Sequence, residues 1–431
     1  MTKQKVLIAG EWRESYQPQG YFAAYDPSTK TPLPEQYPVS GLEEVEQALQ
    51  AAHETVTALR SHSPEDIARF LDLFADKVDA RAGELSALAH LETALPVEPR
   101  LRSSELPRTS NQLRQAAQAA RSRSWTHATI DTPSNIRAMY GPLGGAVIVF
   151  GPNNFPFAFN SAAGGDFGAA IAAGNPVIAK ANTSPPGTTR LFAELAFEAV
   201  LESGLPAGMV QLIYRTPRDV GLTLVSHPLT GATGFTGSRS AGLSLKAAAD
   251  RAGKPIYLEM SSVNPIFVLP GALRERLTQV ANELYNSCSL GAGQFCTNPG
   301  LAIVMDNEEG RAFLREVQRF FEANPAGRER REEHQRGRGG ADGPRRAGGD
   351  RRARGGRARL LLCQHPAERA RRGFPQEPAG PADRGFRHSA PDGHGPRRRA
   401  DGADRRRIGG QPDRLLLQPH PGRRRRALRS R

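Results

Sequence analysis

Cysteine and long apolar runs are both scarce in this sequence. The chain holds three cysteines in 431 residues, too few for a disulfide framework, and this scarcity is typical of a reducing compartment. No run of about 18 apolar residues is present to cross a bilayer, and the amino-terminal MTKQKVLIAGEW has too short an apolar stretch for a signal peptide. We therefore expect a cytoplasmic protein that does not enter the membrane, and no pattern of residues indicates a metal site.

Lysine is absent from the last quarter of the chain, which nevertheless carries most of the positive charge. Residues 326–431 contain 30 arginines and 12 acidic residues, whereas residues 1–325 contain 28 basic and 32 acidic residues. The last quarter also lacks valine, threonine, tyrosine, tryptophan, methionine and asparagine. No strand or helix periodicity can be drawn through such a composition, so we predict a disordered tail.

Two interpretations of the tail remain open. An arginine-rich arm can bind nucleic acid through phosphate contacts. A shifted reading frame in a GC-rich gene would also give this amino-acid composition, because out-of-frame GC-rich codons mostly encode arginine, glycine, alanine and proline. We favour the frameshift, since the tail lacks interleaved aromatic residues and any repeated motif. Nucleic acid is therefore not an expected partner.

The first third of the chain reads as a hairpin followed by helices. Residues 5–12 alternate and end in a turn, as an edge hairpin does. Apolar residues spaced three and four apart predict helices over residues 42–59, 64–91 and 103–123, and Ser63 and Pro64 would begin the second. Residues 136–140 are predicted to form a short strand.

From Gly145 onward the sequence alternates between short apolar runs and helical stretches. The runs are AVIVF, PVIAK, MVQLIY, GATGF and PIYLEM. Such alternation is typical of a parallel sheet covered on both faces, as in nucleotide-binding α/β folds. A second α/β unit follows, with a strand at 265–269, a helix over 272–287, the strand LAIVM and a helix over 309–323.

Several polar residues follow these strands, where open α/β sheets bind ligands. The Asn154 amide can donate to an oxyanion, or it can simply hold the turn. Lys180 can reach an adenosine ribose or its 2′-phosphate, although a lysine at a strand end is usually only solvated. An acidic residue would repel that phosphate, so the hydroxyl of Thr183 favours NADP over NAD, and Arg215 or Arg218 could add a charged contact.

The segment GFTGSRSAG, residues 234–242, joins a strand to a helix through a tight turn. Its backbone N–H groups and the helix dipole can hold a pyrophosphate. The glycines follow the pattern G-x-x-x-x-G rather than G-x-G-x-x-G, so as a glycine motif they indicate only a turn.

Cys296 lies in the glycine-rich segment GAGQFCTNPG. There, backbone N–H groups can stabilise a thiolate that a substrate can approach. A lone cysteine is more often inert core, and we assign that role to Cys288 within the preceding helix. Glu259 ends the strand PIYLEM and can activate water, or it can form an ordinary ion pair.

Taken together and in this order, these five segments resemble the aldehyde dehydrogenase superfamily over about residues 1–325. EMSSVNPIFVLPGAL from Glu259 and LGAGQFCTNPGL from Leu290 are similar to one branch of it, as is GPNNFPFAFN with the GGDFGAAIAAGNPVIAK that follows. That branch contains the α-ketoglutarate semialdehyde (2,5-dioxopentanoate) dehydrogenases and the NADP-dependent fatty aldehyde dehydrogenases.

The resemblance implies a mechanism and roles for single residues. The Cys296 thiolate attacks the aldehyde, the Asn154 amide and the Cys296 N–H hold the oxyanion, hydride passes to the nicotinamide, and water activated by Glu259 hydrolyses the thioester. The same resemblance implies cofactor-binding residues at the adenosine and the pyrophosphate: Lys180, Thr183, Gly237, Ser238 and Gly242. NADP is the preferred cofactor and NAD the alternative. The substrate would be 2,5-dioxopentanoate, oxidised to 2-oxoglutarate, or else a medium- or long-chain aliphatic aldehyde.

The resemblance also predicts an α/β organisation and an oligomer. Residues 1–124 and 141–260 would form a Rossmann-type cofactor domain, 125–140 a bridging strand for oligomerisation, 261–325 an incomplete catalytic domain and 326–431 the tail. Ser261 and Ser262 replace the two glycines that usually follow the catalytic glutamate. No E-x-F-G-P segment, whose glutamate binds the nicotinamide ribose in this family, is found. An inactive truncated protein with a basic tail is therefore the competing expectation.

Overall fold

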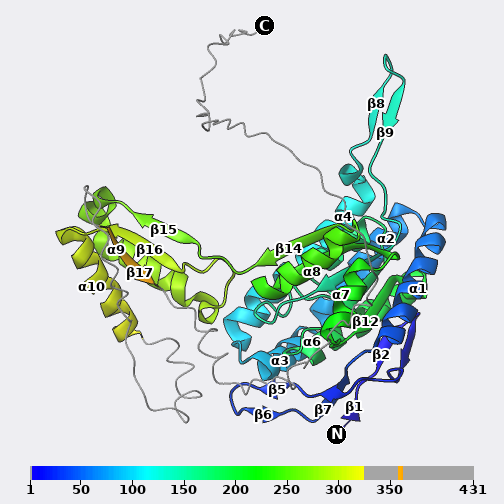
Figure 1. The fold of residues 1–431 in the computed structure, drawn as a ribbon, viewed down its shortest axis with the longest axis horizontal. Helices are drawn as coiled ribbons and strands as arrows, with labels where there is room; N and C mark the ends of the chain where they lie inside the picture. The colour runs from blue at the N-terminus through cyan, green and yellow to red at the C-terminus, as the bar shows by residue number, and fades with distance from the viewer. Residues whose placement is uncertain (1, 325–357, 363–431) are drawn as a thin grey trace, which may run out of the picture. The chain divides into compact units, whose positions relative to one another are not determined.

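The computed structural model describes residues 2–324 and 358–362. Its largest sheet has seven strands in the order β14, β13, β10, β11, β12, β2, β3 (Figure 1). Five of them are the predicted apolar runs, and each is parallel to its neighbours among these five. Their bounds are β10 (Ala146–Phe150), β11 (Val177–Lys180), β12 (Val210–Ile213), β13 (Thr230–Gly237) and β14 (Ile256–Met260). The α/β fold predicted from alternating runs is confirmed.

The predicted amino-terminal hairpin forms the edge of this sheet. Strands β2 (Val6–Ile8) and β3 (Glu11–Arg13) pair antiparallel around a turn at Ala9 and Gly10, both with positive φ. Leu7 then pairs antiparallel with Leu212 of β12. The hairpin thus continues the sheet beyond the last parallel strand.

Helices pack against this sheet in two groups. The first group comprises α1 (Leu42–Ala58), α7 (Arg218–Ser226) and α8 (Arg239–Arg251). The second comprises α2 (Pro64–Ala80), α3 (Ala82–Thr93), α4 (Leu106–Ser122), α5 (Gly165–Ala172) and α6 (Pro186–Ser203). All five residues of β10, the middle one of the five parallel strands, are buried, as expected for a strand covered on both faces.

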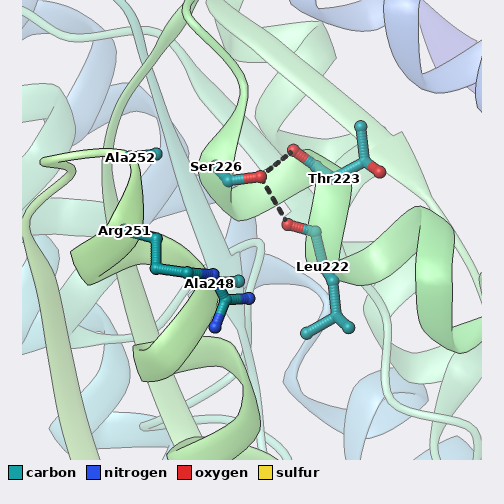
Figure 2. Close-up of a pocket in the computed structure, with 6 residues that line it drawn as sticks. All are labelled: Leu222, Thr223, Ser226, Ala248, Arg251 and Ala252. Carbon is teal, nitrogen blue, oxygen red and sulfur yellow. Dashed lines mark hydrogen bonds between the residues drawn. The ribbon is translucent and has the colours of Figure 1, made fainter. Parts of the chain in front are cut away.

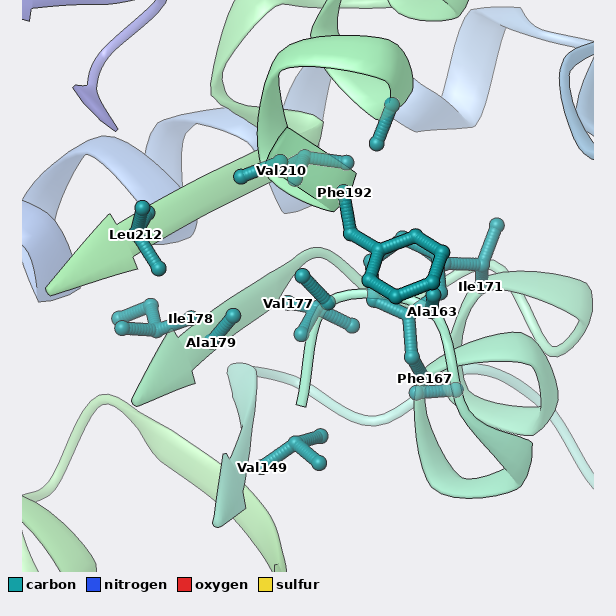
Figure 3. Packing of buried hydrophobic residues seen from close by; sticks show 14 of the residues in the cluster. Val149, Ala163, Phe167, Ile171, Val177, Ile178, Ala179, Phe192, Val210 and Leu212 are labelled. Carbon is teal, nitrogen blue, oxygen red and sulfur yellow. The ribbon is translucent and has the colours of Figure 1, made fainter. Parts of the chain in front are cut away.

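The two groups of helices meet the sheet differently. A hollow lies between α7 and α8, lined by residues of both helices such as Thr223 and Arg251 (Figure 2). On the α5 and α6 side, large side chains pack against the sheet: Figure 3 shows Phe167 and Phe192 near Val177, the first residue of β11. This aromatic and aliphatic core buries the start of the strand that ends at Lys180.

Two of the helix predictions were wrong in their extent. The helix expected over 64–91 is two helices, because Arg81 leaves the helical region with φ −104° and ψ 19°. Apolar spacing continues across this break, so periodicity alone did not reveal it. The helix expected from 103 begins at Leu106, after a nine-residue segment of wider turns, η2 (Val97–Glu105). The start at Ser63 is confirmed, with a reciprocal capping box to Asp66.

Short strands and turns complete the first part of the chain. The strand expected near 136–140 is β9 (Ile136–Ala138), which pairs with β8 (Thr129–Asp131). The other short strands are β1 (Thr2–Lys3), β4 (Tyr21–Phe22), β5 (Tyr25–Asp26), β6 (Thr31–Pro32) and β7 (Glu35–Pro38). The single turns are η1 (Leu59–Ser61), η3 (Ser124–Thr126) and η4 (Ala207–Met209). None of the helices in the described part of the chain is long and apolar enough to cross a membrane.

The predicted second α/β unit has its own small core. Strand β15 (Pro265–Val268), helix α9 (Pro270–Ser289), the turn η5 (Leu290–Gly293), strand β16 (Leu301–Met305) and helix α10 (Glu308–Ala323) follow in that order. Strands β15 and β16 are parallel. Phe313 of α10 is fully buried in this smaller core.

The prediction that the tail contains no strand was wrong for five residues. Strand β17 (Ala358–Leu362) pairs antiparallel with β16. Its sequence ARLLL carries three consecutive leucines, and the free edge of β16 offers unpaired N–H and C=O groups to such a segment. The rest of the predicted tail lies outside the described residues.

Candidate active site

The predicted site residues gather at the carboxyl edge of the large sheet. Lys180 is the last residue of β11 and Gly237 the last of β13, while Glu259 lies one residue before the end of β14. Phe150, the last residue of β10, lies opposite Lys180 on one side and Phe235 on the other. Because β10 is flanked by strands whose connections run in opposite directions, this edge is a topological switch point, where open α/β sheets bind ligands.

Cys296 and Glu259 interact directly. The Glu259 carboxylate lies close enough to the Cys296 thiol to affect its titration. Burial raises the pKa of this thiol above its usual value, and the nearby Glu259 carboxylate raises it further. The backbone N–H groups of Thr297 and Cys296 act in the opposite direction but do not outweigh these effects. The expected stabilisation of a thiolate by the turn is therefore present but is not dominant.

Asn154 lies against the segment that carries Cys296. Its side-chain amide donates to the Gln294 carbonyl, two residues before the cysteine. The structure thus brings together the three residues predicted to be catalytic. Their roles as nucleophile, base and oxyanion donor remain predictions.

Asn264 is a residue of the site that the sequence did not reveal. Its amide donates to the Cys296 carbonyl at 2.7 Å and to the Asn298 carbonyl at 3.1 Å. Its φ of 47° lies in the left-handed region that asparagine tolerates. An asparagine next to Pro265 was the available signal, since the X-Pro dipeptide marks a turn or an extended segment with restricted geometry. Asn264 therefore holds the backbone around Cys296.

Arg100 and Glu105, also unforeseen, hold the segment that carries Asn154. The buried Glu105 carboxylate accepts the Phe157 and Ala158 N–H groups, both at 2.9 Å, and pairs with Arg100. Arg100 in turn donates to the Asn154 carbonyl at 3.1 Å. Burial raises the pKa of Glu105, although Arg100 and the two N–H groups lower it. No periodicity marks these residues, because they lie in the irregular segment η2.

Lys180 has an unusual electrostatic setting. Desolvation and, to a smaller extent, the Arg215 charge lower the pKa of Lys180 to about 8. Its ammonium lies 5.9 Å from the centre of the Phe150 ring. Thr183, three residues further on, is exposed, and so is Arg215, two residues after the end of β12. A cluster of this kind suits a phosphate, which would restore the charge that burial disfavours.

The pyrophosphate prediction falls on the start of helix α8. Ser238 is the N-cap, and its hydroxyl accepts the Ala241 N–H at 3.4 Å. A Cβ on Gly237 would lie 2.8 Å from a Phe235 ring carbon, and one on Gly242 would lie 2.7 Å from the Met260 sulfur. Both glycines therefore permit close packing. The half-buried turn and the helix N-terminus fit a pyrophosphate group.

Two other features are separate from this edge. The hollow between α7 and α8 includes Ser226 and Arg251, which end their helices and so lie toward the amino ends of the parallel strands (Figure 2). Arg218 donates to Ser244 at 3.2 Å. Among the residues that the structure describes, no group of three histidine, cysteine or acidic side chains could hold a metal ion.

Comparison with known proteins decides the family. Residues 12–338 match the sequence profile of the aldehyde dehydrogenase family. The chain belongs to this family. Within it, the chain is 40% identical over 322 residues to alpha-ketoglutaric semialdehyde dehydrogenase 2 of Azospirillum brasilense. It is 39% identical over 298 residues to alpha-ketoglutaric semialdehyde dehydrogenase of Acinetobacter baylyi. The resemblance drawn from the motifs is confirmed.

These matches cover only part of each aldehyde dehydrogenase. They span 72% and 67% of this chain, but only 60% and 53% of the two relatives. Among solved structures, the chain resembles 3,6-anhydro-L-galactose dehydrogenase in complex with NAP, with a TM-score of 0.65, 23% identity and coverage of 75% of this chain and 64% of that one. A salicylaldehyde dehydrogenase from Pseudomonas putida G7 gives a TM-score of 0.65 at 20% identity, with coverage of 75% and 64%. At these identities the likeness shows the fold alone.

Proposed function

We propose that this protein oxidises an aldehyde to a carboxylic acid with NADP or NAD, through a thioester on Cys296. The observation that carries the proposal is the nearness of the Glu259 carboxylate to the Cys296 thiol, together with the Asn154 amide, which lies against the Cys296 segment. A thiol beside a carboxylate can lose its proton to it when a substrate carbonyl arrives. The two semialdehyde dehydrogenase relatives support 2,5-dioxopentanoate as the substrate and 2-oxoglutarate as the product.

The residues divide the chemistry between them. Glu259 accepts the Cys296 proton, and the thiolate sulfur bonds to the aldehyde carbon. The oxyanion that forms is held by the Asn154 amide, which exchanges the Gln294 carbonyl for it, and by the Cys296 N–H. When bound, the nicotinamide supplies an acceptor for the hydride that leaves this carbon. After returning its proton to solvent, Glu259 deprotonates the water that hydrolyses the thioester and frees the acid.

The proposed cofactor preference is NADP. Lys180, the last residue of β11, and Arg215, two residues after β12, place two positive charges near each other. Thr183 adds a hydroxyl, where a carboxylate would repel a 2′-phosphate. NAD can also bind at this site, because its pyrophosphate would meet the same turn and helix N-terminus.

Turnover with variants of the two described cysteines tests the proposal. NADPH formation from 2,5-dioxopentanoate should be abolished in Cys296→Ser and retained in Cys288→Ser, since a serine hydroxyl is far less nucleophilic than a thiolate. A thioester adduct on Cys296, observed by mass spectrometry after brief mixing, would identify the intermediate. Turnover that survives in Cys296→Ser would contradict the proposal. If decanal is oxidised and 2,5-dioxopentanoate is not, the substrate class is aliphatic aldehydes.

A further inference from the structure

Arg108 lies beside the Asn154 segment without an acidic partner. It is in the first turn of α4 and is exposed. Its guanidinium carbon lies 5.1 Å from the centre of the Phe159 ring and 5.9 Å from that of Phe155. Within the described residues, no ion pair or hydrogen bond engages its side chain. The charge is therefore held over two aromatic rings and left free.

Three other arginines nearby are paired with carboxylates. Helix α4 contains two further arginines: Arg114 pairs with Asp76 and Asp79, and Arg121 pairs with Glu65 and Asp72. Arg100, which also faces the Phe155 ring at 4.6 Å, is paired with the buried Glu105. Arg108 differs from all three because, within the described residues, no carboxylate pairs with it.

Both rings under Arg108 belong to the segment that carries Asn154, and one of them contacts the segment that carries Cys296. Phe155 follows Asn154 directly and contacts Phe159 at 5.1 Å between ring centres. Phe155 also contacts Phe295 at 4.8 Å, and Phe295 directly precedes Cys296. A free cation is thus placed on the apolar cluster that joins the amide segment to the nucleophile segment. Aromatic faces hold a guanidinium in orientation without neutralising it.

We propose that Arg108 determines specificity by binding the carboxylate of an aldehydo acid at the end remote from its aldehyde group. This inference rests on the proposed function and names its substrate class. The planar fork of N–H groups on arginine matches a carboxylate with two parallel hydrogen bonds. The phenylalanine rings would contact the carbon chain between the two ends of the substrate. A simple aliphatic aldehyde offers the guanidinium no partner.

Protection of Cys296 from alkylation tests this without requiring turnover. The full-length chain is treated with iodoacetamide, a neutral reagent, at increasing concentrations of 2-oxoglutarate, and labelling at Cys296 is followed by peptide mass spectrometry. In Arg108→Gln the half-protecting concentration should rise about tenfold, the size expected for losing a hydrogen-bonded charge. Arg108→Lys should recover part of this loss. Arg102→Gln, a matched change at an exposed arginine six residues earlier, should leave protection unchanged.

Other results of the protection experiment would contradict different parts of the proposal. If 2-oxoglutarate protects Cys296 equally in Arg108→Gln and in the unaltered protein, Arg108 takes no part in substrate recognition. A loss of protection by neutral pentanamide as well as by 2-oxoglutarate would indicate a general disturbance of the site. Protection by decanoate but not by 2-oxoglutarate would overturn the aldehydo acid class, whereas Cys296-dependent oxidation of aldehydes would still stand on its turnover assay.

Discussion

Glu259 acts on the Cys296 thiol in two opposing ways. Burial raises the pKa of the thiol and the Glu259 charge raises it further, which keeps the sulfur protonated at rest. In the proposed reaction the same carboxylate accepts the proton. A thiol that is protonated at rest is protected from adventitious oxidation, because only the thiolate is strongly nucleophilic.

Replacing this carboxylate should change the titration of the thiol. In Glu259→Gln the midpoint of the pH dependence of Cys296 alkylation should move to lower pH, because the charge that disfavours the thiolate is gone. The rate of carbamidomethylation at Cys296, measured between about pH 6 and pH 10 by peptide mass spectrometry, gives this midpoint. Glu275→Gln is a matched control on an exposed glutamate. A midpoint that stays or rises in Glu259→Gln would contradict the contact.

At the scale of elements, the start of helix α6 depends on one buried carboxylate. Glu92, at the end of α3, accepts the Gly187 and Thr188 N–H groups at 2.7 and 2.8 Å and the Thr188 hydroxyl at 2.7 Å. It thereby satisfies donors that a helix N-terminus leaves free. Burial nevertheless raises the pKa of Glu92 to about 7, because the cost of desolvation exceeds the gain from these three bonds.

The raised pKa makes a pH-dependent contribution to stability. The folded state holds the Glu92 proton more tightly than the unfolded state, so this contribution is complete below about pH 4.5 and is lost as the pH rises through about 7. The difference in free energy of unfolding between the unaltered protein and Glu92→Gln should therefore shrink from pH 5 to pH 8. Urea denaturation at several pH values measures it. The exposed substitution Glu43→Gln should give a difference that does not vary with pH.

Hydrogen bonds between distant elements also hold the segments of the candidate site in position. Arg100 and Glu105 tie η2 to the segment after β10, and Asn264 ties the start of β15 to the backbone around Cys296. Each contact joins residues that are at least 30 positions apart in the chain. The precision of the site thus depends on tertiary hydrogen bonds and not on the strands alone.

At the scale of the molecule, the described residues pack into two hydrophobic cores of unequal size. The larger extends from Val6 to Ala249, while the smaller comprises nine buried residues between Val268 and Val317. A small core buries a smaller fraction of its apolar surface and is correspondingly less stable. The smaller core contains helix α9 before the Cys296 segment and strand β16 after it, so its stability bears on the position of Cys296.

Hydrogen exchange should separate these two cores. Amides of β16 should exchange through openings of lower free energy than those of the fully buried β10. Phe313→Ala, which deletes a fully buried ring from the smaller core at a cost of about 3–5 kcal/mol, should speed exchange in β15, β16 and α10. Exchange in β10 and β13 should not change. Equal acceleration in both cores would show that they unfold as one unit.

Much of this protein could be predicted from local sequence. The five parallel strands and the helices between them were found because period-two and period-3.6 patterns act over a few residues. The segments around Asn154, Glu259 and Cys296 were found because ligands bind at strand ends and because short motifs resemble a family. These signals are contiguous in the chain.

Only the tertiary structure decided the contacts that join distant segments. The break at Arg81, the strand at Ala358–Leu362 and the partners of Arg100, Glu105 and Asn264 all depend on what the remaining chain presents to them. In the sequence, Arg108 is only one of 58 basic residues. Its position over two phenylalanine rings appears only in the folded structure. Sequence patterns determine elements because propensity and periodicity are local, whereas charge pairing, burial and the resulting pKa values depend on neighbours that only the folded chain brings together.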